Sequence, residues 1–137
     1  TDISIKSILV AKQNAAKFYC ENIIFLNHDW NNEWLFPQVD YLISNPPYVD
    51  KEATTGKEEG IWHEPEKALF SKDKGLSDLK LILSKGKNFL NENGKVYLEH
   101  APDQYEELNK FAMENGYLNF SNLNDLNGDK RVSIYQC

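Results

Sequence analysis

The sequence predicts an α/β fold, because short apolar runs of strand length alternate with longer segments of helical periodicity along its 137 residues. Two further observations define the expected sheet more closely. The last two apolar runs are separated only by a turn-rich segment, which is typical of an antiparallel hairpin. An earlier run leads directly into the rigid sequence Asn-Pro-Pro-Tyr, and open α/β sheets bind ligands at strand ends. We therefore expect a Rossmann-like sheet with a binding site at one edge.

The N-terminal part is expected to form one helix and two strands. Ser4 is placed to cap a helix whose apolar residues recur on one side and which ends near residues 21–22. Residues 23–26 are all apolar, as in a buried parallel strand, and residues 39–44 form the next predicted strand. Residues 50–63 are charged and long for a connection, which indicates a functional or mobile loop.

Two more helices and three strands should follow. Ser77 is placed to cap the second helix, which the Asn-Gly pair at 93–94 would stop before a strand at 96–98. The spacing of Asp103 and Glu106 resembles a capping box and predicts the start of a third helix. The final strands, which should pair in antiparallel fashion, are residues 117–120 and 132–135.

The sequence Asn45-Pro46-Pro47-Tyr48 forms a polar hook directly after an apolar strand. Two prolines hold the backbone extended and leave the carbonyls of Asn45 and Pro46 available to a ligand. The Asn45 amide both accepts and donates, and Tyr48 offers a flat face to a planar group. These features suit an amino group or amide that is held in one plane, which favours methyl transfer to nitrogen. The alternative is a Pro-Pro turn that merely ends a strand.

Composition indicates an ordinary globular domain. Hydrophobic residues make up 41% and charged residues 26% of the chain. The net charge of -6 weighs against a broad surface for nucleic-acid phosphates. Because no apolar run is long enough to cross a bilayer and no segment has the layout of a signal peptide, we expect a cytoplasmic protein without a membrane partner.

Cysteine and histidine do not predict a disulfide or a metal site. Cys20 and Cys137 lie far apart in sequence, so free thiols are expected. The three histidines lack ligand spacing with cysteines or carboxylates, and no metal is expected.

Four short motifs form one ordered signature that resembles the HemK-type glutamine N5-methyltransferases, which modify peptide chain release factors. They are Asn45 through Tyr48, Glu64-Pro65, Ala68-Leu69 and Asp73 through Leu76. Further matches are Thr1 through Ser4, Asp29-Trp30, Leu98-Glu99-His100 and Asp125…Gly128…Arg131. The resemblance covers essentially the whole chain. One departure is Ala101-Pro102, where the family usually carries glycine, and it concerns the shape of that loop.

The resemblance implies S-adenosylmethionine as the cofactor and assigns residues to it. Asp2 would bind the ribose hydroxyls, Asp29 would accept from the adenine amino group, and Trp30 would cover the ring. Asn45 would contact both cofactor and substrate. The alternatives are a helix-preceding Asp2 and a turn aspartate followed by a core tryptophan.

The resemblance also implies a class I S-adenosylmethionine-dependent methyltransferase sheet that is truncated at its N-terminal side. The seven glycines do not cluster into the Gly-rich turn that holds the methionine end of the cofactor. We therefore expect residues 1–137 to be the C-terminal portion of a single methyltransferase catalytic domain, inactive when isolated.

The expected activity is methyl transfer to the side-chain amide nitrogen of a release-factor glutamine. Asn45 and Pro46 would accept the amide N–H groups, Pro47 would help line the substrate site, and Tyr48 would pack on the amide plane. One alternative is an adenine N6-methyltransferase acting on DNA or RNA, because an exocyclic amino group presents the same geometry. A binding module without turnover is the other.

Overall fold

A computed structural model of the chain describes residues 1–54 and 65–137. The predicted loop at 50–63 falls largely outside these ranges, as does Glu64 of the second motif. The chain divides into two compact units, Thr1–Phe36 and Pro37–Cys137, and each is described by itself.

The first unit begins with helix α1, Ile5–Lys17. Its predicted cap is confirmed, because the Ser4 hydroxyl accepts a hydrogen bond from the Ser7 amide at 3.3 Å. Ile8 and Ala15 are the buried residues of this helix. The helix ends at Lys17, before the predicted end at residues 21–22.

The predicted strand at residues 23–26 is wrong, because these residues form no strand. A single parallel bridge joins Asp2 to Asn27, with the Asp2 amide donating to the Leu26 carbonyl at 3.2 Å. Beyond Asn27 the ladder cannot continue, because the segment that contains Asp2 turns into α1 at Ile5. Within residues 23–26, Ile24 is 84% exposed.

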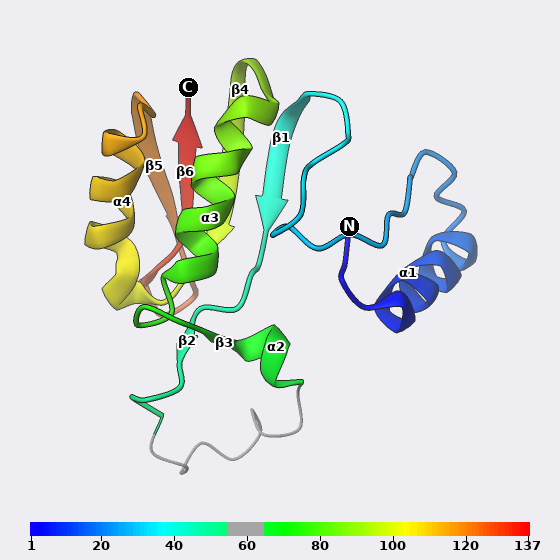
Figure 1. The fold of residues 1–137 in the computed structure, drawn as a ribbon, viewed down its shortest axis with the longest axis horizontal. Helices are drawn as coiled ribbons and strands as arrows, with labels where there is room; N and C mark the ends of the chain where they lie inside the picture. Colours follow the sequence, from blue (N-terminus) through cyan, green and yellow to red (C-terminus); the bar gives the residue numbers. More distant parts are fainter. Residues whose placement is uncertain (55–64) are drawn as a thin grey trace. The chain divides into compact units, whose positions relative to one another are not determined.

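The second unit is built on a mixed four-stranded sheet whose order is β1-β4-β6-β5 (Figure 1). Its strands are β1 (Val39–Ser44), β4 (Leu90–Glu99), β5 (Asn119–Asn124) and β6 (Lys130–Gln136). β1 and β4 are parallel, whereas β6 is antiparallel to both β4 and β5. The predicted α/β class and the closing hairpin are therefore confirmed.

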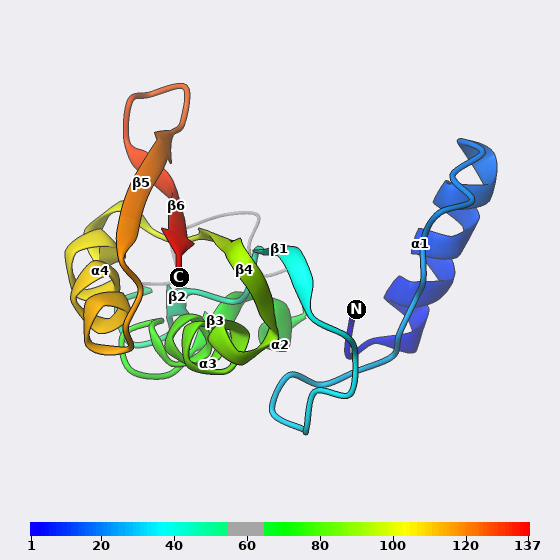
Figure 2. The same ribbon diagram turned by 90° about the horizontal axis from the view of Figure 1, so that it is seen from above.

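Two helices cover one face of this sheet (Figure 2). They are α3 (Ser77–Gly86), extended by the 3-10 turn Lys87–Phe89, and α4 (Tyr105–Glu114), preceded by the 3-10 turn Pro102–Gln104. The core between helices and sheet is mainly apolar. Its most deeply buried members include Leu79, Leu83, Val96, Leu98, Leu108 and Tyr135.

The predicted beginnings of the helices need correction. Helix α3 starts at Ser77, and the hydroxyl that accepts from its first turn belongs to Ser71, which receives the Asp78 amide at 3.0 Å. Helix α4 starts at Tyr105 after the 3-10 turn and has no side-chain cap. A residue six positions before α3 thus replaces its expected local cap, whereas the chain enters α4 directly from the 3-10 turn.

The Asn-Gly pair at 93–94 does not stop a helix, contrary to the prediction. It lies inside β4, where Asn93 has φ 63°. A Cβ on Gly94 would lie 2.9 Å from the Asn91 carbonyl oxygen, so the pair forms a tight kink within the strand. The preceding helix has already ended at Phe89.

A small parallel ribbon lies beyond the end of β1. It consists of β2 (Val49–Asp50) and β3 (Phe70–Ser71), and the short helix α2 (Glu66–Leu69) leads into β3. No helix in the described ranges has the length and apolar character needed to cross a membrane.

Candidate active site

The hook Asn45 through Tyr48 lies where β1 ends, beside the end of β4. The strands are parallel and Ser44 pairs with Leu98, so the residues that follow them leave the same edge of the sheet. Pro46 and Pro47 are buried, whereas Asn45 is exposed. The prolines therefore fix the backbone while the Asn45 amide stays accessible.

Tyr48 is held by its hydroxyl, which donates to Oε1 of Glu99 at 2.8 Å. Burial raises the pKa of the Tyr48 phenol, the hydrogen bond and charge of Glu99 raise it further, and Arg131 acts in the opposite direction. The phenol is therefore protonated at neutral pH and acts as the donor of this hydrogen bond.

Gln104 holds the backbone of the hook from a different direction. Its side-chain Nε2 donates to the carbonyl oxygens of Tyr48 at 2.8 Å and Lys74 at 3.0 Å. Its Oε1 accepts from the Ala101 amide at 2.9 Å. Because Gln104 is only 6% exposed, these bonds join three loops inside the protein.

The motif Asp73 through Leu76 forms a turn that presses against the hook. Asp73, Lys74 and Gly75 all have positive φ, with values of 54°, 54° and 83°. A Cβ on Gly75 would overlap the Tyr48 carbonyl oxygen, so only glycine fits. The first and last motifs of the predicted signature are thus in direct contact.

His100 is fully buried behind the site. Its Nδ1 lies 2.7 Å from the Ala101 carbonyl oxygen, which can only accept, so Nδ1 carries the proton. Burial lowers the pKa of His100, and its Nε2 therefore accepts from the Ser133 hydroxyl at 2.8 Å. Ala101 has φ -72°, so the absence of the family's glycine here imposes no strain.

Arg131 connects the last motif to the same edge. Its guanidinium donates to the carboxylate of Asp125 at 3.2 Å and to the His100 carbonyl at 3.4 Å. Asp125 in turn accepts the amides of Asn127 and Asp129 and so closes the turn before β6. The motif Asp125…Gly128…Arg131 thus links the turn before β6 to the backbone at His100, next to Glu99.

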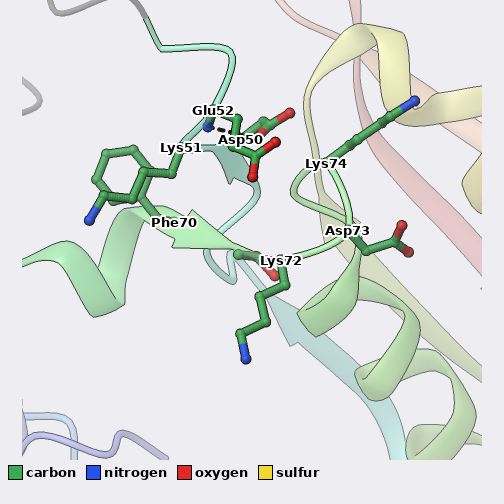
Figure 3. Close-up of a pocket in the computed structure, with 8 residues that line it drawn as sticks. Asp50, Lys51, Glu52, Phe70, Lys72, Asp73 and Lys74 are labelled. Atoms are coloured by element: carbon green, nitrogen blue, oxygen red, sulfur yellow. Dashed lines mark hydrogen bonds between the residues drawn. The ribbon is translucent and has the colours of Figure 1, made fainter.

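A pocket of about 420 Å³ lies beyond the hook, next to β2 and β3 (Figure 3). In the close-up, the side chains of Lys72 and Lys74 extend away from the acidic pair Asp50 and Glu52. Its lining residues are Asp50, Lys51, Glu52, Phe70, Ser71, Lys72, Asp73 and Lys74. This lining mixes both charges and includes no residue of the hook.

Of the residues expected to bind the cofactor, Asp2, Asp29 and Trp30 lie in the first unit, whereas Asn45 lies in the second. The bridge between Asp2 and Asn27 brings Asp2 close to the segment that contains Asp29 and Trp30. One oxygen of Asp2 accepts from the Ser4 amide at 2.7 Å, which agrees with the alternative role before the helix. Oδ1 of Asp29 accepts from the Asn31 amide at 2.9 Å.

The sequence analysis did not identify Gln104, and it named Glu99 only as part of the motif Leu98-Glu99-His100. The signal for Glu99 was present, because it ends a strand beside the hook. No short motif marks Gln104, since its partners Tyr48 and Lys74 are distant in sequence.

Comparison with known proteins places this geometry in context. No family model matches the chain. Over 98% of its length it is 32% identical to a release factor glutamine methyltransferase of Francisella tularensis and 34% identical to one of Borreliella burgdorferi. It covers 48% and 47% of these proteins. It is also 35% identical to a bifunctional methyltransferase of Rickettsia felis, of which it covers 26%.

Solved structures show the same fold. A methyltransferase from Pyrococcus furiosus matches with a TM-score of 0.64 and 15% identity, over 97% of this chain and 58% of its own. A candidate rRNA methylase from Clostridium thermocellum matches with a TM-score of 0.57 and 13% identity, over 99% and 73%.

The chain has a methyltransferase fold, and the curated relatives it matches are methyltransferases. Within that class, the chain matches the C-terminal part of the release factor glutamine methyltransferases, which confirms the HemK-type resemblance. The chain spans about half the length of those relatives.

Proposed function

We propose that the full-length protein transfers the methyl group of S-adenosylmethionine to the side-chain amide nitrogen of a glutamine in a peptide chain release factor. The observation that carries this proposal is the hook itself. Its prolines are buried, its Asn45 amide is exposed, and Tyr48 is anchored at both its hydroxyl and its carbonyl. Such a rigid acceptor site suits a small planar group.

The chemistry that this site performs is orientation. An amide nitrogen is a poor nucleophile because its lone pair is delocalised, so its position relative to an electrophile governs the rate. The Asn45 side-chain oxygen and the Pro46 carbonyl would accept the two N–H groups, Pro47 would line the substrate site, and the Tyr48 ring would pack on the amide plane.

The cofactor supplies an electrophilic methyl group when bound. Asp2 would accept from its ribose hydroxyls, Asp29 from its adenine amino group, and Trp30 would cover the adenine ring. Asn45 would contact both molecules.

Competition between substrates tests this function. Purified full-length protein is incubated with labelled cofactor, a release factor, and DNA or RNA. We expect the label in protein, with modest salt dependence, because the chain has a net charge of -6 and counterion release dominates nucleic-acid binding. Label in nucleic acid alone would instead establish the adenine N6-methyltransferase, because its flipped base offers the same geometry.

A further inference from the structure

We propose that Glu99 is a positioning residue, which orients the Tyr48 ring for the acceptor amide. This inference rests on the proposed function. Glu99 ends β4 beside the hook, and its Oε1 receives the Tyr48 hydroxyl at 2.8 Å.

The backbone contacts leave the direction of the ring open. Gln104 and Gly75 fix the Tyr48 carbonyl, but a tyrosine side chain can still rotate about χ1. A second anchor at the hydroxyl fixes the long axis of the ring, because its two ends are then both held. The position of the ring beside the acceptor amide is thereby set before substrate binds, which lowers the cost of orientation.

The charges around this pair favour Glu99 as its acceptor. A carboxylate only accepts, so it holds the neutral phenol in a single donor direction. Arg131, the cation that faces Tyr48 from β6, donates to Asp125 and to the His100 carbonyl. The charge of Arg131 thus acts on Tyr48 in the direction opposite to that of Glu99, while Arg131 itself is held by Asp125 and the His100 carbonyl.

A double-mutant cycle in the full-length protein tests the inference. We expect Glu99→Ala to lower kcat about tenfold with little change in the KM for cofactor, since a hydrogen bond to a charged acceptor is lost. Glu99→Gln keeps an acceptor oxygen and should recover most of that loss. In the Tyr48→Phe background, Glu99→Ala should lower kcat little further, because the two substitutions remove the same interaction.

The control is Glu92→Ala, at an exposed position on the same strand, which should leave kcat unchanged. Unfolding by urea is measured for every variant, so that a loss of stability is recognised. Additive effects of Glu99→Ala and Tyr48→Phe would overturn the proposal, as would equal losses for Glu99→Gln and Glu99→Ala.

A measurement that needs no methyl-accepting substrate distinguishes this inference from the proposed function. Because Glu99 raises the pKa of Tyr48, Glu99→Gln should lower the pH at which this phenol ionises, measured by ultraviolet titration against Tyr48→Phe. Unchanged ionisation would refute the contact. A shifted ionisation in a protein that does not methylate release factors would refute the proposed function and leave the hydroxyl contact established.

Discussion

The Gln104 side chain donates to the Tyr48 carbonyl at 2.8 Å across 56 residues of sequence. It thereby joins the turn before α4 to the hook that follows β1. The same amide holds Lys74, so the acceptor site depends on a residue that does not contact the substrate in our proposal.

Gln104→Leu should lower the free energy of unfolding by about 3 kcal/mol, because two carbonyls and one amide lose their buried partner. Urea denaturation measures the loss. The control is the exposed Gln38→Leu, which should change stability by about 0.5 kcal/mol or less. Similar values for the two variants would contradict the role of Gln104 as a buried link.

Gly75→Ala should be more destabilising than Gly128→Ala. Both glycines have positive φ, 83° and 90°, but only the Cβ at 75 would overlap the Tyr48 carbonyl oxygen. Nothing lies within 4 Å of a Cβ at 128. We expect a loss of about 1 kcal/mol at 128 from backbone conformation and at least about 2 kcal/mol more at 75. Equal unfolding free energies for the two variants would mean that the turn at Gly75 can move away from the Tyr48 carbonyl.

Asn45→Ala in the full-length protein should reduce methyl transfer on the order of 10²-fold, because one acceptor of the amide is lost. Cofactor affinity, measured by calorimetry, should stay within about threefold, since the other proposed contacts remain. Asn88→Ala, at an exposed residue in the turn after α3, is the matched control. Near-normal turnover of Asn45→Ala would remove Asn45 from the mechanism.

Tyr48→Phe should be milder than Tyr48→Ala. Phenylalanine keeps the flat ring and loses only the hydrogen bond to Glu99, whereas alanine removes the packing surface as well. Steady-state kinetics with a release factor would rank them. Equal losses would indicate that the hydroxyl alone matters.

Acid should destabilise the fold through His100. Burial lowers the pKa of this imidazole in the folded protein below its ordinary value of 6.5, so the unfolded chain binds more protons beneath that pH. Stability should therefore fall as the pH drops through about 6.5 toward the lower folded-state pKa. Urea midpoints between pH 7.5 and 5 test this, with His100→Gln expected to show a flatter dependence. Parallel curves for both proteins would argue against the effect.

The sequence predicted the α/β class, the limits of β1 and the closing hairpin because each depends on a local pattern. Residues 39–44 are strand-like on their own, and the turn-rich segment 124–129 can only reverse the chain. The hook was identified from its chemistry, and the structure places it at the strand end that the pattern indicated.

The missed features depend on contacts between distant residues. Ser71, at the end of β3, replaces the expected local cap of α3, and Asn93-Gly94 lies in a strand because β4 pairs with β1 on both sides of it, at Leu90 and at Lys95. Residues 23–26 have strand composition, but the single bridge in this segment is made by the next residue, Asn27. Local propensity does not depend on these contacts between distant residues, so it could not tell whether a segment forms a strand or which residue caps a helix.

The link from Gln104 to the hook limits how this protein can be recombined with its relatives. A crossover between residues 76 and 99 would combine the hook and glycine turn of one parent with the Glu99 and Gln104 positions of another. If the second parent differs at either position, the chimera inherits an acceptor site without its anchors. Crossovers before residue 39 keep these residues together, so shuffled libraries should yield active enzymes more often when their breakpoints lie there.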